Sequence, residues 1–342
     1  MRKLSIFILS ASVSLALMAS VSMSNSKYIT TSAETDKKTV YIGGMAAGFT
    51  LKAGGIQVIG LCEVVTEKGI FSPAREQGVR MGDKIVKASG IKIESIAELN
   101  EILNKGKGKQ IELEIVRADE SLRMNVTPAK EKSTNNYKIG ILARDNISGI
   151  GTISYIEKNT HKFGALGHSV VGDDKKELSI SSGTVFECNI IGVSKGIRGR
   201  AGELRGMFLS NKNFGTANKL CECGIFGAIN EDLDFSDLST VLADSSEAKP
   251  GAAYIYSTVN GVSPEKFQIE IVKVDRFNHD NKDYVIKITD EKLIDLTGGI
   301  VQGMSGSPIV QEGKMIGAIT HVFLNDPTRG YAINIETMLN QD

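Results

Sequence analysis

The chain has 342 residues, of which 41% are hydrophobic and 23% are charged, and 40 basic side chains balance 40 acidic ones. A net charge of zero excludes the broad electrostatic field with which proteins attract nucleic acid or a membrane surface. The length favours two modest domains over a single core. The 36 glycines and 6 prolines indicate tight turns between short strands, so we expect a mainly β protein.

The first 26 residues are typical of an export signal. Arg2 and Lys3 are followed by an uncharged stretch from Leu4 to Met23, which is the pattern of a secretory signal peptide. A stretch of about 20 residues is also long enough to cross a bilayer as an uncleaved anchor. The sequence therefore predicts an extracytoplasmic protein that is exported across a membrane or anchored in one.

No metal or other cofactor is predicted. The sparse placement of the cysteines does not describe a disulfide framework. A single residue separates Cys221 from Cys223, which is not the usual zinc spacing, and the HExxH motif of zinc peptidases does not occur. The four cysteines are Cys62, Cys188, Cys221 and Cys223.

Residues 38–130 alternate short apolar strands with glycine turns and contain one helical pattern, Ile96 to Leu103. This order predicts a small β-barrel with helices. The run from Ser72 to Ile85 resembles the PDZ signature, in which a short helix ends at glycine and a Gly-Asp turn, here Gly82-Asp83, starts the next strand. The resemblance implies a PDZ domain over residues 38–130.

PDZ domains add an extended peptide to a sheet edge and capture a terminal carboxylate with the backbone N–H groups of a glycine-containing loop. The glycine cluster that starts at Gly43 is the candidate loop. Gly48 would allow close approach of the peptide, and Phe49, Thr50 and Leu51 would begin the peptide-facing strand. A plain structural turn is the alternative, because glycine clusters commonly mark turns.

After the polar stretch Glu131 to Asn136, a second rhythm of strands and glycines fills residues 138–342. A segment of roughly 200 residues with this pattern suits a double β-barrel or a sandwich. We expect a second domain over this range.

The segment Gly303-Met304-Ser305-Gly306-Ser307-Pro308 resembles the nucleophile loop of chymotrypsin-fold serine peptidases, Gly-x-Ser-Gly-x-Pro. Its glycines permit a tight turn that presents Ser305 Oγ while the N–H groups of Gly303 and Ser305 converge on a developing oxyanion. Position 307 is serine, so the Gly-x-Ser-x-Gly elbow of α/β-hydrolases is not matched. A structural Gly-Ser turn is the alternative.

A serine nucleophile needs a base, and His168 is the first candidate because it lies between glycines and an apolar strand. The polar neighbours of His161 and His279 indicate surface positions. His321 follows the nucleophile hairpin closely, so spacing alone leaves it open as a competitor. The chain has four histidines: His161, His168, His279 and His321.

The acid that orients the base is predicted to be Asp290, at the end of the strand-like stretch Tyr284 to Thr289. It lies 15 residues before Ser305, whereas the familiar chymotrypsin pattern has its acid midway between histidine and serine. Other candidates stay open. They are Asp173, Asp174, Asp232, Asp234, Asp237 and Asp244.

Together with the export segment and the PDZ signature, the stretches Gly164 to His168 and Gly303 to Pro308 resemble the stage IV sporulation protein B serine peptidases of endospore-forming bacteria, over nearly the whole chain. The resemblance implies a chymotrypsin-like double β-barrel with the triad His168, Asp290 and Ser305, and it favours His168 over His321.

The same resemblance implies a place between the two membranes that surround the developing spore. There, cleavage of a membrane-bound regulatory protein would release an intramembrane protease that activates a late sporulation transcription factor. The implied partners are a protein substrate in or at a membrane and a peptide C-terminus or internal segment at the PDZ domain. Cleavage of the chain itself, near its N-terminal linker, is also expected.

Two other functions compete with an active endopeptidase. The chain would be a binding scaffold if the peptidase fold were catalytically inactive and the PDZ domain were its working part. Quality-control peptidases of the HtrA kind also join a serine protease to PDZ domains, but there the protease precedes the PDZ domain and here it follows.

Overall fold

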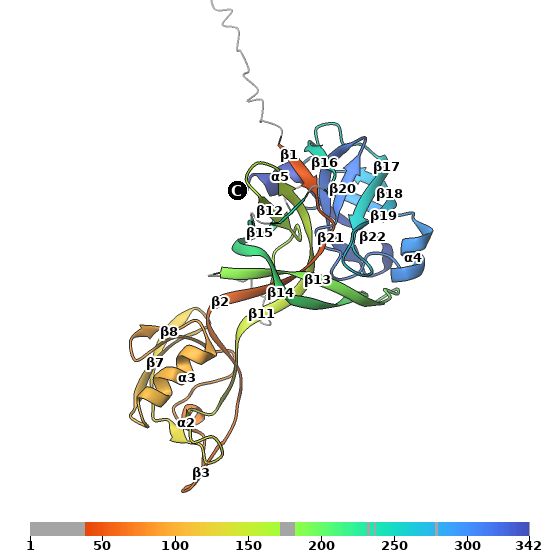
Figure 1. The fold of residues 1–342 in the computed structure, drawn as a ribbon. Helices are drawn as coiled ribbons and strands as arrows, with labels where there is room; N and C mark the ends of the chain where they lie inside the picture. Colours follow the sequence, from red (N-terminus) through yellow and green to blue (C-terminus); the bar gives the residue numbers. More distant parts are fainter. Residues whose placement is uncertain (1–37, 172–181, 231–232, 236, 278–279, 342) are drawn as a thin grey trace, which may run out of the picture. The chain divides into compact units, whose positions relative to one another are not determined.

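The computed structural model describes residues 38–171, 182–230, 233–235, 237–277 and 280–341. The predicted export segment, residues 1–26, lies outside this part of the chain, and so do Asp173, Asp174, Asp232 and His279. Among the described residues, no helix is both long and apolar enough to cross a membrane. The predicted fold class is confirmed: the chain is mainly β, with a PDZ domain followed by a chymotrypsin-like peptidase domain (Figure 1).

The first elements form the PDZ domain, apart from β1 and the first half of β2. They are β1 (Thr39–Ile42), β2 (Ala46–Leu61), β3 (Val64–Thr66), β4 (Gly69–Phe71), α2 (Pro73–Glu76), β5 (Lys84–Ala88), β6 (Ile91–Lys92), α3 (Ile96–Lys105), β7 (Ile111–Arg117), β8 (Glu120–Val126), β9 (Ala129–Lys130) and β10 (Tyr137–Lys138).

The other elements build the peptidase domain. They are β11 (Ile141–Glu157), β12 (Lys162–Ala165), β13 (Ser182–Ser194), β14 (Glu203–Cys221), β15 (Gly224–Ile229), β16 (Thr240–Ala243), β17 (Gly251–Ser257), β18 (Glu265–Val274), β19 (Tyr284–Ile288), α4 (Glu291–Thr297), β20 (Pro308–Gln311), β21 (Lys314–Phe323), β22 (Asp326–Asn334) and α5 (Ile335–Leu339).

In the PDZ domain, helix α3 forms where the sequence places apolar residues at helical spacing, and it buries Leu99 and Leu103. Its first turn is closed by a capping box in which Ser95 and Glu98 each bond the other's backbone N–H. The Gly82-Asp83 turn is held in place by hydrogen bonds to the Asp83 side chain. The buried Asp83 carboxylate accepts from Arg80 N at 2.8 Å and from Arg117 Nε at 2.6 Å, so a paired charge holds the turn.

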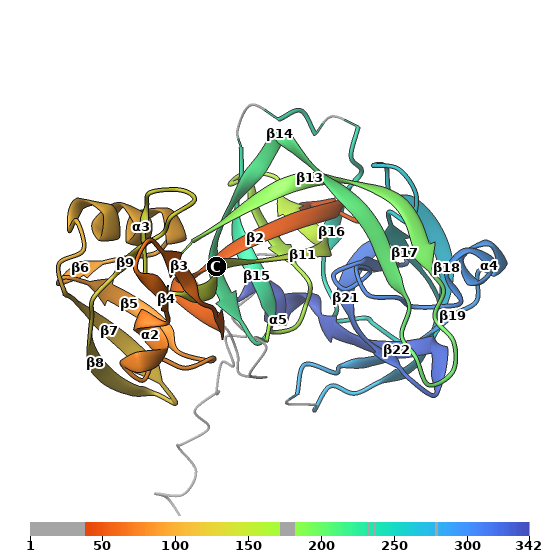
Figure 2. The same cartoon turned by 90° about the horizontal axis from the view of Figure 1, so that it is seen from below.

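Barrel one of the peptidase domain is a closed ring of antiparallel strands in the order β2, β13, β14, β15, β12 and β11, which pairs again with β2. Figure 2 shows β2, β13 and β14 as neighbours in this ring. The core of the barrel contains Phe49, Ile153, Phe163 and Val185. Side chains that alternate along each strand fill its interior, as expected for a small barrel.

Barrel two closes in the order β17, β18, β19, β22, β21 and β20, which returns to β17. Its core contains Ile255, Phe267, Ile286 and Ile309. Strand β1 joins the two rings, because it pairs with β11 of barrel one and with β16, which in turn pairs with β21 of barrel two.

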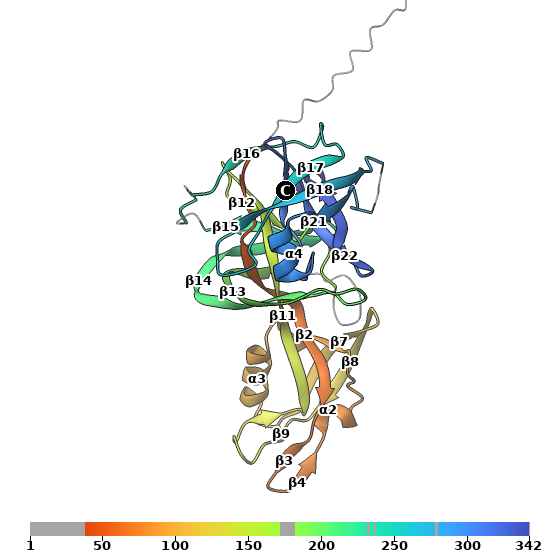
Figure 3. The same cartoon turned by 90° about the vertical axis from the view of Figure 1, so that its right-hand side faces the viewer.

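Strands β2 and β11 belong to both domains. Residues 46–52 of β2 pair with residues 146–152 of β11 in barrel one, whereas residues 57–61 pair with 141–144 in the PDZ domain. Figure 3 shows the two strands side by side along this path. The PDZ domain is therefore inserted between two neighbouring strands of barrel one.

This insertion moves both predicted domain boundaries. Residues 38–52 were expected in the PDZ domain, but Phe49 and Leu51 pack in the core of barrel one. Conversely, Ile139 lies in the PDZ core, with Ile141 and Ala143 packed against it, although residues 138 onward were expected in the peptidase domain. A buried apolar strand can be recognised in a sequence, but the core that buries it is set by distant residues.

Candidate active site

The nucleophile loop lies between the end of α4 and the start of β20, and its glycines are required by contact as well as by conformation. Gly306 has a φ of +96°, and a Cβ placed on it would lie 2.1 Å from Thr152 O and 2.6 Å from Leu166 N. Its own N–H donates to Ile319 O at 2.8 Å. The loop is therefore pressed between barrel one and β21, and no other residue fits at position 306.

Ser305 is half-buried, and its Oγ donates a hydrogen bond to Thr320 O at 2.8 Å. Within the described residues, the backbone N–H groups of Gly303 and Ser305 make no hydrogen bond. Both groups can therefore donate to a substrate oxygen, which is the role predicted for them in the oxyanion hole.

Thr152, on β11, fastens the nucleophile loop to barrel one, and sequence reasoning assigned it no role. This buried residue, 1% exposed, donates from its N–H to Ser305 O at 3.0 Å and from Oγ1 to Gly303 O at 2.7 Å. Its carbonyl accepts from Leu166 N at 3.3 Å. One residue thus contacts both flanks of Ser305 and the turn that leads to His168. An isolated threonine in a strand carries no local signal for such a role.

His168 follows a turn that directs it away from the end of β12. Leu166 and Gly167 have φ values of +69° and +73°, a left-handed pair that is unusual for leucine. The imidazole Nδ1 lies 2.7 Å from Ser169 O. Because a carbonyl oxygen can only accept, Nδ1 carries the proton and Nε2 is left as the acceptor, which is the tautomer that a general base needs.

Burial lowers the pKa of His168 below its ordinary value, and the hydrogen bond to Ser169 O only partly opposes this shift. Burial disfavours the charged imidazolium because the side chain has lost solvent. The ring is therefore neutral near pH 7 and ready to accept a proton.

The loop of the predicted nucleophile and the turn that precedes the predicted base are in contact. Leu166, two residues before His168, touches the Gly306 position. A Cβ on Gly167 would lie 2.9 Å from Cγ2 of Thr320, the residue whose carbonyl holds the Ser305 hydroxyl. Among the described residues, Ser305 and His168 share no direct hydrogen bond. The hydroxyl must leave Thr320 O before the base can take its proton.

His321, the competing histidine, lies beside the predicted base, with ring centroids 5.0 Å apart. Desolvation, followed by the charges of His168 and Lys282, lowers the pKa of His321 to about 4. Although His321 is exposed, its lowered pKa keeps it neutral near pH 7. Two neutral imidazoles therefore sit together next to the nucleophile loop.

Asp290 caps a helix in this structure. Its Oδ1 accepts from Leu293 N at 3.1 Å at the start of α4, and its Oδ2 accepts from Gln268 N at 3.2 Å. Among the described residues, His168 Nδ1 bonds Ser169 O and no carboxylate. Within the described residues, the carboxylate of Asp290 thus accepts from two backbone donors and makes no hydrogen bond with His168. Its role as the triad acid stays a prediction.

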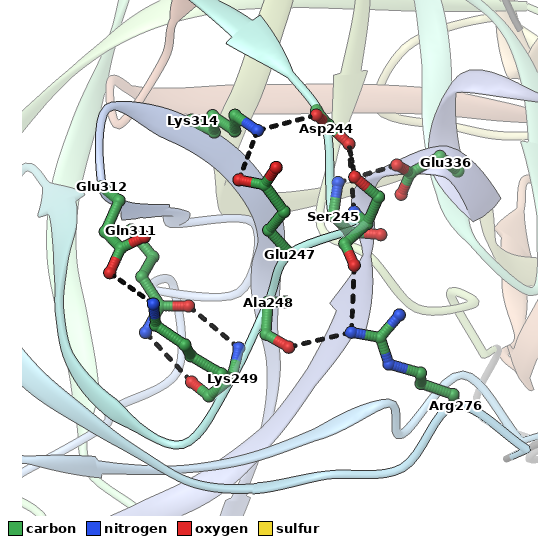
Figure 4. Close-up of polar contacts among 11 residues, drawn as sticks. Asp244, Ser245, Glu247, Ala248, Lys249, Arg276, Gln311, Glu312, Lys314 and Glu336 are labelled. Carbon is green, nitrogen blue, oxygen red and sulfur yellow. Dashed lines mark hydrogen bonds and ion pairs between the residues drawn. The ribbon is translucent and has the colours of Figure 1, made fainter. Parts of the chain in front are cut away.

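Asp244, an alternative acid, is committed to a different network (Figure 4). This buried carboxylate accepts from Lys314 Nζ at 3.1 Å and from Ser246 Oγ at 2.6 Å. The loop it begins is held by Arg276, which donates to Ser246 O and Ala248 O. Asp244 therefore stabilises the link between β16 and β17. The other described candidates, Asp234 and Asp237, are exposed.

The peptide-binding residues predicted in the PDZ domain lie elsewhere. Gly48, Phe49, Thr50 and Leu51 pair with β11 on one side and with β13 on the other. Both edges of this strand are filled, so a peptide cannot add to it. Gly48 is needed for packing within the barrel, because a Cβ there would lie 2.4 Å from the Phe208 ring.

A cavity of about 520 Å³ lies in the PDZ domain, where the β3–β4 hairpin faces the chain around β9. Its walls include Phe71, Pro73 and Asn135, and none of the predicted catalytic residues. The predicted nucleophile Ser305 and base His168 therefore lie outside this cavity.

Comparison with known proteins agrees with the two domains. Residues 135–339 match the family model described as SpoIVB peptidase S55, and residues 45–127 match the PDZ domain model. A Lactococcus lactis subsp. lactis protein that bears the name of a zinc metalloprotease is 33% identical over 107 residues. That match covers 30% of this chain, and the chain spans only 24% of the relative's length.

Solved structures give low similarity scores. The PDZ domain of an SdrC-like protein from Listeria monocytogenes has a TM-score of 0.22 at 18% identity, covering 27% of this chain and 90% of that one. The protease Rv3671c from M. tuberculosis H37Rv, in its inactive form, has a TM-score of 0.32 at 14% identity, covering 56% and 83%. Human heparin binding protein has a TM-score of 0.26 at 11% identity, covering 53% and 76%.

Proposed function

The chain belongs to the SpoIVB peptidase S55 family, and we propose that it acts as a serine endopeptidase with Ser305 as nucleophile and His168 as base. The observation that carries the proposal is the contact, at Gly306, Thr152 and Leu166, between the loop that contains Ser305 and the turn that leads to His168. Residues far apart in the sequence are brought together there with donors suited to acyl transfer.

In the proposed reaction, the Ser305 hydroxyl turns from Thr320 O towards the unprotonated Nε2 of His168. As Oγ attacks the peptide carbonyl, His168 takes its proton and later gives it to the leaving amine. The N–H groups of Gly303 and Ser305 stabilise the oxyanion, a contribution of about 10²–10³ in rate per donor. Water activated by His168 then hydrolyses the acyl-enzyme.

Orientation of the base comes from Ser169 O in this scheme. A carbonyl acceptor fixes the tautomer of His168, as the triad acid does, but it brings no negative charge to stabilise the imidazolium. If Asp290 is the acid, the Nδ1–H group of His168 must turn from Ser169 O to the Asp290 carboxylate, whose oxygens can each accept a further hydrogen bond.

We base a proposal for the biological setting and the substrate on the family match and on the sequence. We propose that the peptidase works outside the cytoplasm, between the forespore and mother-cell membranes. There it cleaves a membrane-bound regulatory protein, and itself, so that an intramembrane protease becomes active. The family match and the export pattern of residues 1–26 support this role.

A catalytically inactive PDZ scaffold is the second candidate, and one observation favours it. Ser305 Oγ is hydrogen-bonded to Thr320 O and not to His168, so the resting geometry is not that of an engaged dyad. The two functions differ in a single measurable property, namely whether peptide bonds are hydrolysed.

The test compares residues 27–342 with the Ser305→Ala and His168→Ala variants, and follows self-cleavage and cleavage of a protein substrate by mass spectrometry. We expect a loss of about 10⁴-fold or more in both variants, with folding retained in circular dichroism. His161→Ala, a histidine outside the site, serves as the matched control and should cleave like the wild type. Equal cleavage by all four proteins would overturn the proposal.

A further inference from the structure

The cavity of about 520 Å³ in the PDZ domain takes no part in the proposed peptidase chemistry. It lies where the β3–β4 hairpin faces the chain around β9, and Figure 3 shows these strands side by side. Cavities that bind small molecules measure about 300–1,000 Å³, and apolar side chains line most of their surface. The size of this cavity is therefore that of a small-molecule site.

Backbone hydrogen bonds fix the walls of the cavity. Lys132 N donates to Val65 O at 2.9 Å and fastens the β3–β4 hairpin to the segment after β9. In that segment, Asn135 N donates to Glu131 O and Glu131 N donates to Asn136 O, both at 2.9 Å, and these bonds close a turn that borders the cavity. A ligand therefore meets a shape that is already formed, which lowers the entropy lost on binding.

Apolar side chains form one part of the lining. Pro73 and Pro128 are buried, whereas Phe71 is 40% exposed although it lines the cavity. Ile70, the preceding residue of β4, is 62% exposed but does not line the cavity. The ring of Phe71 therefore offers apolar surface that a ligand in the cavity can remove from water.

The charged groups around the cavity leave two lysines unpaired. Lys68 and Lys130 line it and form no ion pair within the described part of the chain. The three carboxylates of the lining already have partners: Glu67 with Lys132 Nζ, Glu76 with Ser72 N, and Glu131 with Lys138 Nζ. Because these carboxylates are engaged, the two lysines are available to an acid group on a ligand.

We propose that this cavity binds a small molecule that joins a compact apolar body to a single acid group. The apolar body packs against Phe71, and the carboxylate, sulfonate or phosphate group accepts hydrogen bonds from Lys68 and Lys130. An uncharged apolar ligand gains nothing from the lysines, and a purely polar anion leaves Phe71 in water. The site adds a ligand-binding function to the PDZ domain and does not depend on Ser305 chemistry.

The experiment titrates residues 27–342, which include every described strand and helix, with two fluorescent probes of similar shape. One is the anion anilinonaphthalene sulfonate, and the other is the uncharged phenylnaphthylamine. We expect the parent to bind the anion more tightly than the uncharged probe. Equal affinity for the two probes, or no binding of the anion, would overturn the proposal.

Substitution on β4 tests the apolar part of the site. Phe71→Ala should weaken both probes about tenfold, because the ring no longer covers the apolar body. Ile70→Ala is the matched control, since Ile70 is the neighbouring residue, is more exposed and lies outside the lining. It should bind both probes like the parent. A similar loss in the two variants would mean that the probes bind exposed apolar surface outside the cavity.

Substitution of the lysines tests the acid-binding part. The double variant Lys68→Gln, Lys130→Gln should bind the sulfonate about tenfold more weakly and phenylnaphthylamine like the parent. The matched control is Lys107→Gln, Lys109→Gln, which removes two exposed lysines of the same domain that do not line the cavity. If the control lost as much sulfonate affinity as the test variant, the proposal would fail.

Lysine acetylation locates the ligand in the unsubstituted protein and so covers variants that fail to fold. With saturating sulfonate, mass spectrometry should show slower acetylation of Lys68 and Lys130 and an unchanged rate at Lys109. Unchanged acetylation of all three lysines would place the probe elsewhere and refute the proposal. None of these measurements depends on cleavage, so an inactive peptidase would contradict the proposed function and leave this test intact.

Discussion

The two halves of the candidate site are held in different ways. Ser305 lies in a loop fastened by backbone hydrogen bonds to Thr152 and Ile319, from two different barrels. His168 is directed by a left-handed pair in its own chain and by the carbonyl of its neighbour, Ser169. The position of the nucleophile therefore depends on how the barrels meet, whereas the orientation of the base depends on local backbone geometry and burial.

The largest effect on activity is expected from Gly306→Ala, which displaces the loop that contains Ser305. The new Cβ would overlap Thr152 O and Leu166 N, so the loop must move and both oxyanion donors move with it. We expect kcat/KM to fall by about 10³-fold, as when an oxyanion donor is lost, in a steady-state assay with a cleavable peptide.

Gly313→Ala provides the control for that variant. Gly313 also has a positive φ, +81°, but no atom lies within 4 Å of its added Cβ. This substitution carries a similar backbone strain of about 1 kcal/mol without the overlap, so activity should be retained. Equal losses in the two variants would mean that strain, and not contact with barrel one, explains the effect.

A smaller effect is expected from Thr152→Val, which removes the Oγ1 hydrogen bond to Gly303 O and keeps the shape of the side chain. The backbone bond to Ser305 O persists, so the loop should loosen without leaving its place. We expect kcat to fall about tenfold with little change in KM, because positioning and not substrate binding is affected.

Rescue separates positioning from mere stability in this prediction. Thr152→Ser restores a hydroxyl and should recover most of kcat, although it is less well packed than valine. If serine were as impaired as valine, or if KM rose in place of kcat, Thr152 would be a packing residue only.

The smallest expected effect is a shift in the pH dependence of activity, which tests the predicted base His168. Catalysis requires neutral His168, and burial lowers its pKa below the ordinary 6.5. Activity should therefore persist as the pH falls to 6.5 and decline only as it falls through the lowered pKa. The acid limb of kcat/KM reports this value, and His161→Ala should leave the limb in place. A limb above pH 6.5 would show that His168 is not desolvated as the structure indicates.

Much of the site could be predicted because short motifs encode local backbone shape. The glycines around Ser305 and the Gly164 to His168 stretch indicate turns whatever surrounds them, and these two turns are in contact in the structure. The Gly82-Asp83 turn likewise predicted the PDZ domain, which the buried pair of Asp83 and Arg117 explains. The mainly β class was predicted from the 36 glycines and 6 prolines.

The features that could not be predicted depend on contacts with residues that are distant in the sequence. Phe49 and Leu51 were expected to face a peptide, but β13, more than 130 residues later, fills that edge. Asp290 was expected beside His168, but it caps α4 with one carboxylate oxygen and accepts from β18 with the other. Thr152 and Ile141 lie on one strand, β11, whose two halves serve different domains.

By itself, the sequence predicted the turns, the candidate nucleophile and the candidate bases, since a turn needs only its own few residues. The tertiary structure decided which strand edges are filled, which carboxylates are already bonded and where one domain enters the other. The physical reason is that strand pairing and burial are non-local: the backbone groups of a strand are satisfied by any edge that the whole fold brings to it.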